Sequence, residues 1–537
     1  MTSDPATSAA APAPVSAQTP ASTPASTPPP TATDRPPASG VKARVATVAA
    51  IALAWLVTLP RLVPSTFGDH GTYVSVAERL LAGDRLYVDV WDNKDPLFYY
   101  ALAVGRLVSP LADVVLEVLW VLGAGVSVLV LARAAGARRG LALVAGLGAT
   151  PLLLTGPAYE SGMTHLPGLA LLLAAVACAV RSRWVVAGVL VGLLLLTKLV
   201  LAPVVAGALL VVALHRRPTG GLSGLARAVV GAVALLAVGI GAMWLRGELA
   251  GWLENFRLNA DYAEGELAAS QYGPVIGHLL RAFPEDGRGA GMVTVATLVV
   301  VLLAIPRSWR PRASDGASPV PDAATDTASR TISPTVLWDL VVVSLALGLV
   351  VIGATATWPH HAQTLSAPGG FALALVATRL SDRVMHWRAV AVVLLTGYLT
   401  AGALHPYFTL TAARSVPTNL QLLQRDSPDS VVLDALLQVR SYARAGSNDA
   451  TAHAVGLGHL QLVCPRFHQY SLEPAAILDL TAACLQRADA VIVDDTVRPE
   501  AGEPEWNAYV ARVRALVATG YDCMRTTGSQ VCVRRAG

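Results

Sequence analysis

Long apolar runs recur along most of this 537-residue chain, and they constrain its fold more than any other feature. A helix needs about 20 apolar residues to cross a bilayer, and a charge at its centre costs about 2.5 to 3.5 kcal/mol on insertion scales. The chain is 54% hydrophobic and only 14% charged, whereas a soluble domain typically carries about 25% charged residues. These features predict a polytopic α-helical membrane protein.

Cutting the chain wherever charges interrupt the apolar runs yields about eleven transmembrane helices. Their predicted ranges are 45–63, 113–132, 140–157, 165–180, 184–198, 199–214, 226–245, 289–305, 336–354, 366–379 and 387–404. Lysine and arginine concentrate in every second short connector, and such connectors face the cytoplasm. The basic connectors contain Lys42 and Arg44, Arg133 with Arg138 and Arg139, Arg181 and Arg183, Arg216 with Arg217 and Arg227, Arg307 with Arg310 and Arg312, and Arg379 with Arg383 and Arg388. The amino terminus is therefore predicted inside, and the region after residue 404 outside.

Three segments follow from this topology. Residues 1–43 are rich in Ala, Pro, Ser and Thr, have little apolar surface to bury and are predicted to be a disordered cytoplasmic tail. Residues 44–404 form the transmembrane domain, with a first external loop at 64–112. Residues 405–537 form an extracytoplasmic domain. The first apolar run lacks a convincing small-residue cleavage site, so we interpret it as a retained span and not a secretory signal.

The region after residue 404 has the pattern of a small α/β domain. "DSVVLDALLQVRSYARA" is typical of a helix, whereas "HAVGLG" and "ADAVIVDD" are apolar and favour strands. It contains four of the five cysteines, and an even number of cysteines in an oxidising compartment favours disulfides over reduced thiols. We pair Cys523 with Cys532 across two short strands, and Cys464 with Cys484. Metal binding is less favoured, because no CxxC spacing occurs.

Charge and sequence motifs argue against three kinds of ligand. The net charge of +4 is small and dispersed, which does not indicate a nucleic-acid partner. "VGLGHL" lacks the strand, GxGxxG and helix order of a dinucleotide site. No glycine-rich phosphate loop is evident, which argues against a cytoplasmic nucleotide-sugar donor.

The first external loop concentrates ionisable residues in "FGDHGTYVSVAERLLAGDRLYVDVWDNKDPLFYY", residues 67–100. Tyr73, Val76, Ala77 and Leu80 recur at helical spacing, which predicts an amphipathic helix at the membrane interface. A second helix is predicted to begin near Pro96. The polar turn "DVWDNKD" between the two helices would hold charged groups near the lipid headgroups.

The first span, an acidic residue, "Y", "A", "LLAG", "LY" and "WDNKDPLFYY" resemble the first extracytoplasmic loop of the GT-C glycosyltransferases. The subgroup that they resemble is that of protein mannosyltransferases and lipid A aminoarabinose transferases. Asp69 matches the first acid of the family's acidic pair, Lys94 matches the lysine of its "KPPL" turn, and Pro96 matches the last proline of that turn. Two positions depart from the pattern: His70 replaces the second acid and Asp95 the first proline. The topological resemblance covers residues 45 to 405, with weaker support from "GLLLLTKLVLAP" and "HHAQTLSAPGG".

This resemblance implies transfer of a sugar from a polyprenyl-phosphate carrier to an acceptor on the extracytoplasmic face, with inversion at the anomeric carbon. The acceptor would be an envelope glycan, a lipid or a protein. The long Ala-, Pro- and Thr-rich start is typical of a high-GC bacterium, so we expect this protein in a bacterial plasma membrane and an envelope glycan as the leading class of acceptor. A carboxylate would take the acceptor proton, and cations would balance the departing phosphate. A divalent cation is left open, because a hard cation favours two carboxylates and the "DH" pair provides one.

Asp69 is the predicted general base, and an exposed Asp with a pKa near 3.9 is already ionised at neutral pH. The alternative is that Asp69 caps a helix starting at Thr72. Lys94 is the predicted phosphate partner, and the alternative is a solvated lysine paired with Asp92 or Asp95.

Six further residues complete the predicted substrate-binding set. Lys198 lies between two apolar runs and is either a second phosphate contact or a lysine that snorkels at a helix end. Glu160 and His165 lie in the next external connector, where the alternative is a short loop with a helix cap at Ser161 or Thr164. The full set beside Lys94 is His70, Tyr73, Glu160, His165, Lys198 and His361.

Two other classes of function compete with a glycosyltransferase. A secondary transporter or flippase would suit the many Gly-rich apolar helices, although transporters place ionisable groups near the bilayer midplane at paired broken helices. The ionisable groups here are predicted outside the membrane. A catalytically inactive scaffold for envelope assembly is the third class, because His70 replaces an acid.

Overall fold

The structure is a computed structural model. It describes residues 39–63, 69–109, 111–156, 159, 161–269, 332–354, 359–379, 435, 438–446, 461–466, 469, 475–526 and 529–535, with the backbone alone at 39–43, 69, 261–269, 353–354, 359–360, 461 and 526. The chain divides into two units, Met1–Ala43 and Arg44–Gly537. The predicted spans 289–305 and 387–404 and the "HAVGLG" strand lie outside the described residues.

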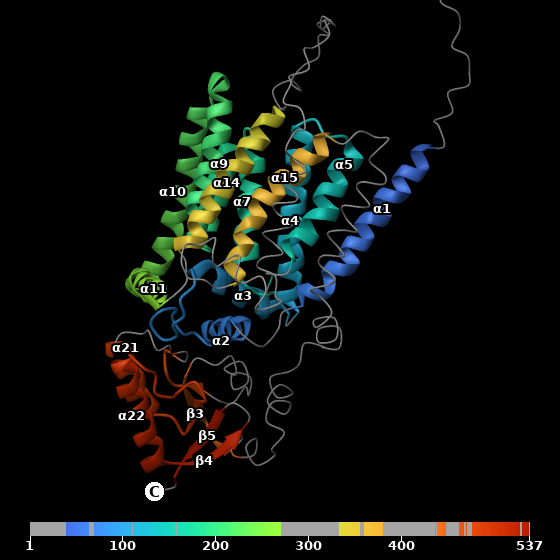
Figure 1. Cartoon of the computed structure of the whole chain (residues 1–537). Coiled ribbons are helices and arrows are strands. Elements are labelled where there is room, and N and C mark those ends of the chain that lie inside the picture. Colours follow the sequence, from blue (N-terminus) through green and yellow to red (C-terminus); the bar gives the residue numbers. More distant parts are fainter. Residues whose placement is uncertain are drawn as a thin grey trace, which may run out of the picture. The chain divides into compact units, whose positions relative to one another are not determined.

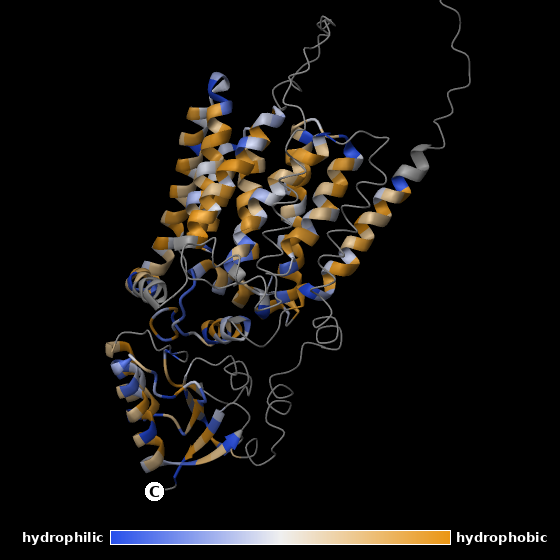
Figure 2. Cartoon of the chain, in the orientation of Figure 1, coloured by the Kyte–Doolittle hydropathy of each residue, from blue (hydrophilic) through white to orange (hydrophobic). Residues whose placement is uncertain are grey.

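Four described helices are long and apolar enough to cross a membrane: Arg44–Leu62, Ala112–Ala134, Gly221–Arg246 and Pro334–Ile352. They belong to α1 (Ser39–Thr58) with the 3-10 turn η1 (Leu59–Leu62), α4 (Ala112–Ala134), α10 (Gly221–Arg246) and α14 (Pro334–Ala354). Their middle portions are strongly apolar (Figure 2). The position of these helices follows the apolar runs, because a helix satisfies its own backbone hydrogen bonds in lipid.

Shorter apolar helices fill the bundle between these four. One segment combines α5 (Arg139–Leu143), the π-helical turn η2 (Val144–Ala149) and α6 (Thr150–Leu154). The others are α7 (His165–Val180), α8 (Trp184–Leu195), η3 (Leu199–Leu201) leading into α9 (Ala202–His215), η6 (Pro359–Leu365) and α15 (Ser366–Arg379). α7 is central, since it packs against α4, α8 and α9.

One end of the bundle contains the segments that matter for the site (Figure 1). Here lie α2 (Asp69–Leu81), α3 (Pro96–Val108) and α11 (Leu249–Ala269). Glu248, whose side chain is fully buried, accepts hydrogen bonds from the Leu86 backbone N–H over 3.0 Å and from the Tyr100 hydroxyl over 2.6 Å. This carboxylate therefore ties the predicted first external loop, residues 64–112, to the α10–α11 junction.

The region after residue 404 contains a five-stranded sheet in the order β2-β1-β3-β5-β4. Its strands are β1 (Ser441–Ala445), β2 (Gln461–Leu462), β3 (Ala490–Asp494), β4 (Tyr521–Thr526) and β5 (Ser529–Arg534). β1 runs parallel to β2 and β3, and β5 runs antiparallel to β3 and β4. Helices α21 (Ala475–Leu485) and α22 (Pro504–Gly520) share a core with Ala443, Val491 and Cys532.

One secondary-structure prediction in this region is wrong. "SYARA", predicted as the end of a helix, is strand β1. Tyr442 packs in a different core cluster from Ala443 and Ala445, which is the alternation of a strand with both faces covered. Pairing with β2 and β3 on both sides therefore overrides the local helical pattern.

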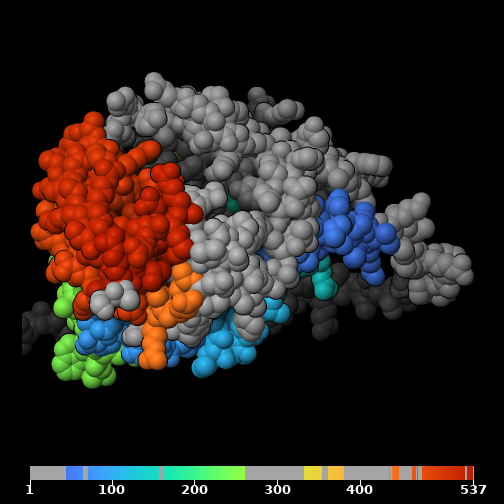
Figure 3. Space-filling model, turned by 90° about the horizontal axis from the view of Figure 1, so that it is seen from below, coloured from blue at the N-terminus to red at the C-terminus, as the bar shows by residue number. Residues whose placement is uncertain are grey.

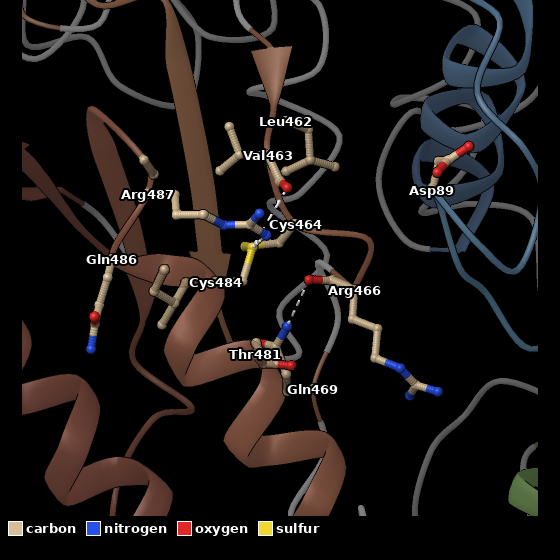
Figure 4. Close-up of a disulfide and its surroundings, with 12 residues drawn as sticks. Asp89, Leu462, Val463, Cys464, Arg466, Gln469, Thr481, Cys484, Gln486 and Arg487 are labelled. Carbon is tan, nitrogen blue, oxygen red and sulfur yellow. Dashed lines mark hydrogen bonds between the residues drawn. A yellow bond between two sulfur atoms is a disulfide. The ribbon is translucent and has the colours of Figure 1, made fainter.

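The structure has two disulfides, Cys464–Cys484 and Cys523–Cys532, which are the pairs favoured by the sequence. The first joins the segment after β2 to α21 (Figure 4), and the second crosses directly from β4 to β5. Cys178 in α7 is the free cysteine among the described residues.

Residues of the sheet region contact the predicted first external loop, and Figure 3 views the molecule from the side where they adjoin. Arg79 of α2 donates a hydrogen bond to the Leu462 carbonyl, and the Trp91 backbone N–H donates to the Pro465 carbonyl over 2.9 Å. The Arg466 guanidinium lies 3.6 Å from the centroid of the Trp91 ring, within the range of a cation–π contact. The segment 462–466 is thus held against this loop.

Candidate active site at one end of the helix bundle

Asp69 is the first residue of α2, and His70 is the second. The helix therefore begins three residues before Thr72, the start that the alternative interpretation of Asp69 as a cap assumed. The Asp69 side chain lies outside the described part of the chain. Tyr73, one turn later, is buried with Val76 and Ala77, which is the apolar face expected from their spacing.

Two segments meet at the polar turn that joins α2 to α3. The Leu199 backbone N–H donates to Asp95 Oδ2 over 2.9 Å, and the Leu97 N–H donates to the Leu196 carbonyl over 2.9 Å. Burial raises the pKa of Asp95, while its backbone hydrogen bond and the charges of Lys198 and Lys94 act in the opposite direction. The turn thus places the predicted first external loop against the residues that follow α8.

Lys198 is 9% exposed. It precedes η3, and its side-chain carbons approach Gly168 of α7, so an added Cβ at Gly168 would lie 3.0 Å from Lys198 Cβ. The lysine is therefore packed among helices at the end of the bundle. In the structure Lys198 lies near Lys94 and Asp95, although about a hundred residues of the chain separate it from them.

The Lys94 ammonium lies near the ring of Tyr73 and does not pair with Asp92. The Asp92 carboxylate accepts hydrogen bonds from the Tyr99 hydroxyl over 2.5 Å and from the Asn93 backbone N–H over 2.6 Å. The Lys94 ammonium lies 5.9 Å from the centroid of the Tyr73 ring. The Lys94 carbonyl accepts from the Tyr87 hydroxyl over 2.6 Å, which fixes the backbone of the turn.

A network of charged residues anchors α2 to α3 and α4. His70 Nε2 lies 3.3 Å from Asp113 Oδ2. Arg106 donates to the same oxygen over 3.0 Å and to Glu78 Oε1 over 2.9 Å. Burial raises the pKa of Glu78, although Arg106 opposes this shift. Arg106 and Asp113 therefore hold α2 both at its first turn and near its last.

His70 also packs against a glycine whose backbone leaves no room for a side chain. An added Cβ at Gly162 would lie 2.0 Å from His70 Nδ1, and Gly162 has a φ of +78°, where glycine is favoured. Beside it, Tyr159 donates a hydrogen bond to Glu117 Oε2. The connector before α7 therefore covers His70 through its backbone.

A cavity of about 250 Å³ opens beside this network. His70, Asp113, Glu117 and Thr197 supply its polar groups, and apolar side chains such as Phe98 and Trp120 supply the remainder. The cavity is bounded by α2, α3, α4, the connector at Gly162, and the ends of α7 and α8.

Two predicted histidines also meet. The rings of His165, at the start of α7, and His361, in η6, have centroids 5.4 Å apart. Thr164 precedes α7 without forming a side-chain cap, so the predicted alternative of a helix cap is wrong at Thr164. The predicted residue Glu160 lies outside the described residues. Among those that are described, no group of three or more His, Cys, Asp or Glu side chains could hold a metal ion.

Sequence reasoning missed Asp113, Glu117 and Arg106 as residues of this site. Asp113 and Glu117 were placed within or at the edge of the predicted span 113–132, with no role assigned. The sequence did contain a sign of their role, because two carboxylates in the first turns of an apolar span are costly unless they face protein or a cavity. The helical spacing of four residues also puts both on one face of α4.

No protein-family model matches the sequence, and no curated protein matches it. Solved structures do match the fold. The crystal structure of ArnT from Cupriavidus metallidurans bound to undecaprenyl phosphate has a TM-score of 0.57 at 15% identity, and covers 93% of this chain and 99% of the ArnT chain. The apo structure of the same ArnT has a TM-score of 0.54 at 14% identity, and covers 92% and 98%. The likeness extends over nearly the whole of both chains, and it shows that this protein has the GT-C fold.

Proposed function

We propose that this protein is an inverting membrane glycosyltransferase that moves a sugar from a polyprenyl-phosphate carrier to an acceptor on the extracytoplasmic face. The observation that carries the proposal is the meeting of Lys94 and Lys198 around Asp95 at one end of the bundle. Two cations at that end could balance the phosphate of a carrier whose chain stays in the bilayer. The ArnT structure with undecaprenyl phosphate supports such a ligand for this fold.

In this mechanism an acceptor hydroxyl attacks the anomeric carbon of the donor sugar. Asp69 takes the hydroxyl proton as the new carbon–oxygen bond forms. The bond from the anomeric carbon to the phosphate oxygen breaks at the same time, and the polyprenyl phosphate leaves with the electron pair. Lys94 and Lys198 balance its charge. His70, Tyr73, His165, Glu160 and His361 stay proposed substrate-binding residues, and no step is assigned to a divalent cation.

A transfer assay tests this function. Membranes with and without the protein receive polyprenyl phosphate loaded with radiolabelled sugar, and incorporation into endogenous acceptors is counted. We expect protein-dependent counts that Asp69→Asn abolishes. Asp89→Asn is the matched control, because Asp89 lies in the same loop but is partly exposed and pairs with Arg85. Equal counts for wild type and Asp69→Asn would refute the mechanism.

The two competing functions predict different results in the same assay. A transporter or flippase would show no dependence of sugar incorporation on the Asp69 carboxylate. A scaffold would lose function when the surface of the sheet region is changed, with no response to Asp69→Asn. We favour the enzyme because Lys94 and Asp95 directly precede α3 and Lys198 lies between α8 and η3, so these charged groups lie at helix ends and not at the middle of a helix.

A further inference from the structure

We propose that the 250 Å³ cavity binds the acceptor, and that the acceptor is an amphipathic alcohol with an apolar chain and no negative charge near the bound hydroxyl. The proposal rests on the glycosyl transfer proposed above and names the class of molecule that receives the sugar. Three observations carry it: an unsatisfied carboxylate oxygen, the sign of the local charge and the apolar walls.

The first observation concerns Asp113, which lines the cavity and is 8% exposed. Its Oδ2 is bonded to Arg106 and faces His70, whereas its Oδ1 is buried and accepts no hydrogen bond from any described residue. Leaving a buried polar atom unpaired costs about 1 to 3 kcal/mol. A ligand hydroxyl that donates to Oδ1 removes this cost, whereas a ligand that carries only acceptors does not.

The second observation is the sign of the charge. Asp113, on the cavity wall, shares the single guanidinium of Arg106 with Glu78, so that two carboxylates face one cation. No lysine or arginine is found among the described residues that line the cavity. Because like charges repel strongly where solvent is excluded, a phosphate or carboxylate is disfavoured here. The carrier phosphate therefore belongs beside Lys94 and Lys198.

The third observation is the composition of the walls. Phe98, Trp120, Leu171 and Leu193 face the cavity from four different helices. Removing apolar surface from water is favourable by about 25 cal/mol of free energy per Å². These walls therefore favour a hydrocarbon chain over a hydrated polysaccharide or a peptide. A ligand with a hydrogen-bond-donating hydroxyl at one end and a hydrocarbon chain at the other is an amphipathic alcohol.

Photolabelling of the purified full-length protein tests the occupant without requiring sugar transfer. Two probes of equal length are compared, a diazirine-bearing ten-carbon alcohol and the corresponding carboxylic acid. We expect the alcohol to label the peptides that contain Phe98, Trp120 or Leu193, and the acid to label them at least about tenfold less, which corresponds to about 1.4 kcal/mol. Equal labelling by both probes, or no labelling of these peptides, would overturn the proposal.

Two variants on one helix separate the cavity from the general lipid-facing surface. Ala101 lines the cavity, so Ala101→Phe fills part of it and should lower labelling by the alcohol. Val104 of the same helix is 63% exposed, so Val104→Phe adds its bulk outside and should leave labelling unchanged. The milder Ala101→Leu should give an intermediate loss if Ala101→Phe fails to fold. Equal effects of Ala101→Phe and Val104→Phe would contradict the assignment.

Binding of polyprenyl phosphate distinguishes the acceptor from the donor. Ala101→Phe should leave the Kd for polyprenyl phosphate unchanged, and a marked rise in that Kd would assign the cavity to the carrier chain. If photolabelling succeeds but no sugar is transferred, the binding site stands and the proposed function fails. If sugar is transferred but the peptides are not labelled, the function stands and this inference fails.

Discussion

The Leu199 backbone N–H donates a hydrogen bond to the Asp95 carboxylate over 2.9 Å, across a sequence separation of 104 residues. This bond fixes the turn that carries Lys94 to the segment that carries Lys198. Asp95 stands where the GT-C pattern has a proline, which has no side chain that could accept this bond. The departure from the pattern therefore has a structural role here, as an anchor between the two proposed phosphate-binding lysines.

Replacement of Asp95 should reveal the cost of burying its charge. Its pKa is raised by burial, so the folded state holds the proton to a higher pH than the unfolded state, which loses it near 3.9. The stabilisation that this raised pKa provides is thus present at low pH, and it is lost as the pH rises through the folded-state pKa of Asp95. Asp95→Asn keeps an acceptor for Leu199, so its Tm relative to wild type should increase from pH 4 to pH 7.5. A constant difference in Tm would contradict a raised pKa.

Replacement of Lys94 should weaken donor binding. A hydrogen bond to a charged group contributes about 1.5 to 3 kcal/mol, so Lys94→Ala should raise the KM for the polyprenyl-phosphate sugar about 10- to 100-fold. Lys94→Arg keeps the charge and should lose less. Arg138→Ala, a cation in a predicted cytoplasmic connector, serves as the control. Steady-state transfer kinetics measure the effect, and an unchanged KM in Lys94→Ala would remove this lysine from the site.

Replacement of Gly162 should displace His70. Alanine at a φ of +78° costs roughly 1 to 2 kcal/mol in backbone strain, and its Cβ would overlap the His70 ring in addition. We expect Gly162→Ala to lower both the Tm and the transfer rate. Gly241→Ala in α10 is the matched control, since no atom lies within 4 Å of its added Cβ and alanine favours a helix. Equal Tm values for the two variants would refute the packing described here.

Removal of the Cys464–Cys484 disulfide should affect the first external loop. The segment 462–466, which contains Cys464, accepts hydrogen bonds from Arg79 and Trp91. A bridge that closes a loop of this length contributes about 3 kcal/mol through chain entropy. The double variant Cys464→Ser with Cys484→Ser should lose more transfer activity than Cys523→Ser with Cys532→Ser, measured at a temperature where both remain folded. A larger loss of transfer activity in Cys523→Ser with Cys532→Ser would show that the segment 462–466 does not support the site.

The sequence by itself determined the regular features of this protein. Apolar runs located the helices at 112–134, 165–180 and 366–379 to within a few residues, because burial in lipid or among helices depends on local composition. The period of Tyr73, Val76 and Ala77 predicted α2. The even number of cysteines in a region predicted to be external, with two predicted strands around Cys523 and Cys532, favoured the disulfide pairs that the structure has. Strand β1 was missed because its pairing with β2 and β3 is not a local property.

Only the tertiary structure decided which ionisable groups meet. Asp113 is 43 residues from His70, and Asp95 is 104 residues from Leu199, so no periodicity in the chain connects them. A sequence pattern shows which face of a helix is apolar, but it does not show how far each helix is rotated or shifted against its neighbours. Contacts between side chains depend on those rotations and shifts, and for this reason the cavity beside Asp113 emerged only from the packed bundle.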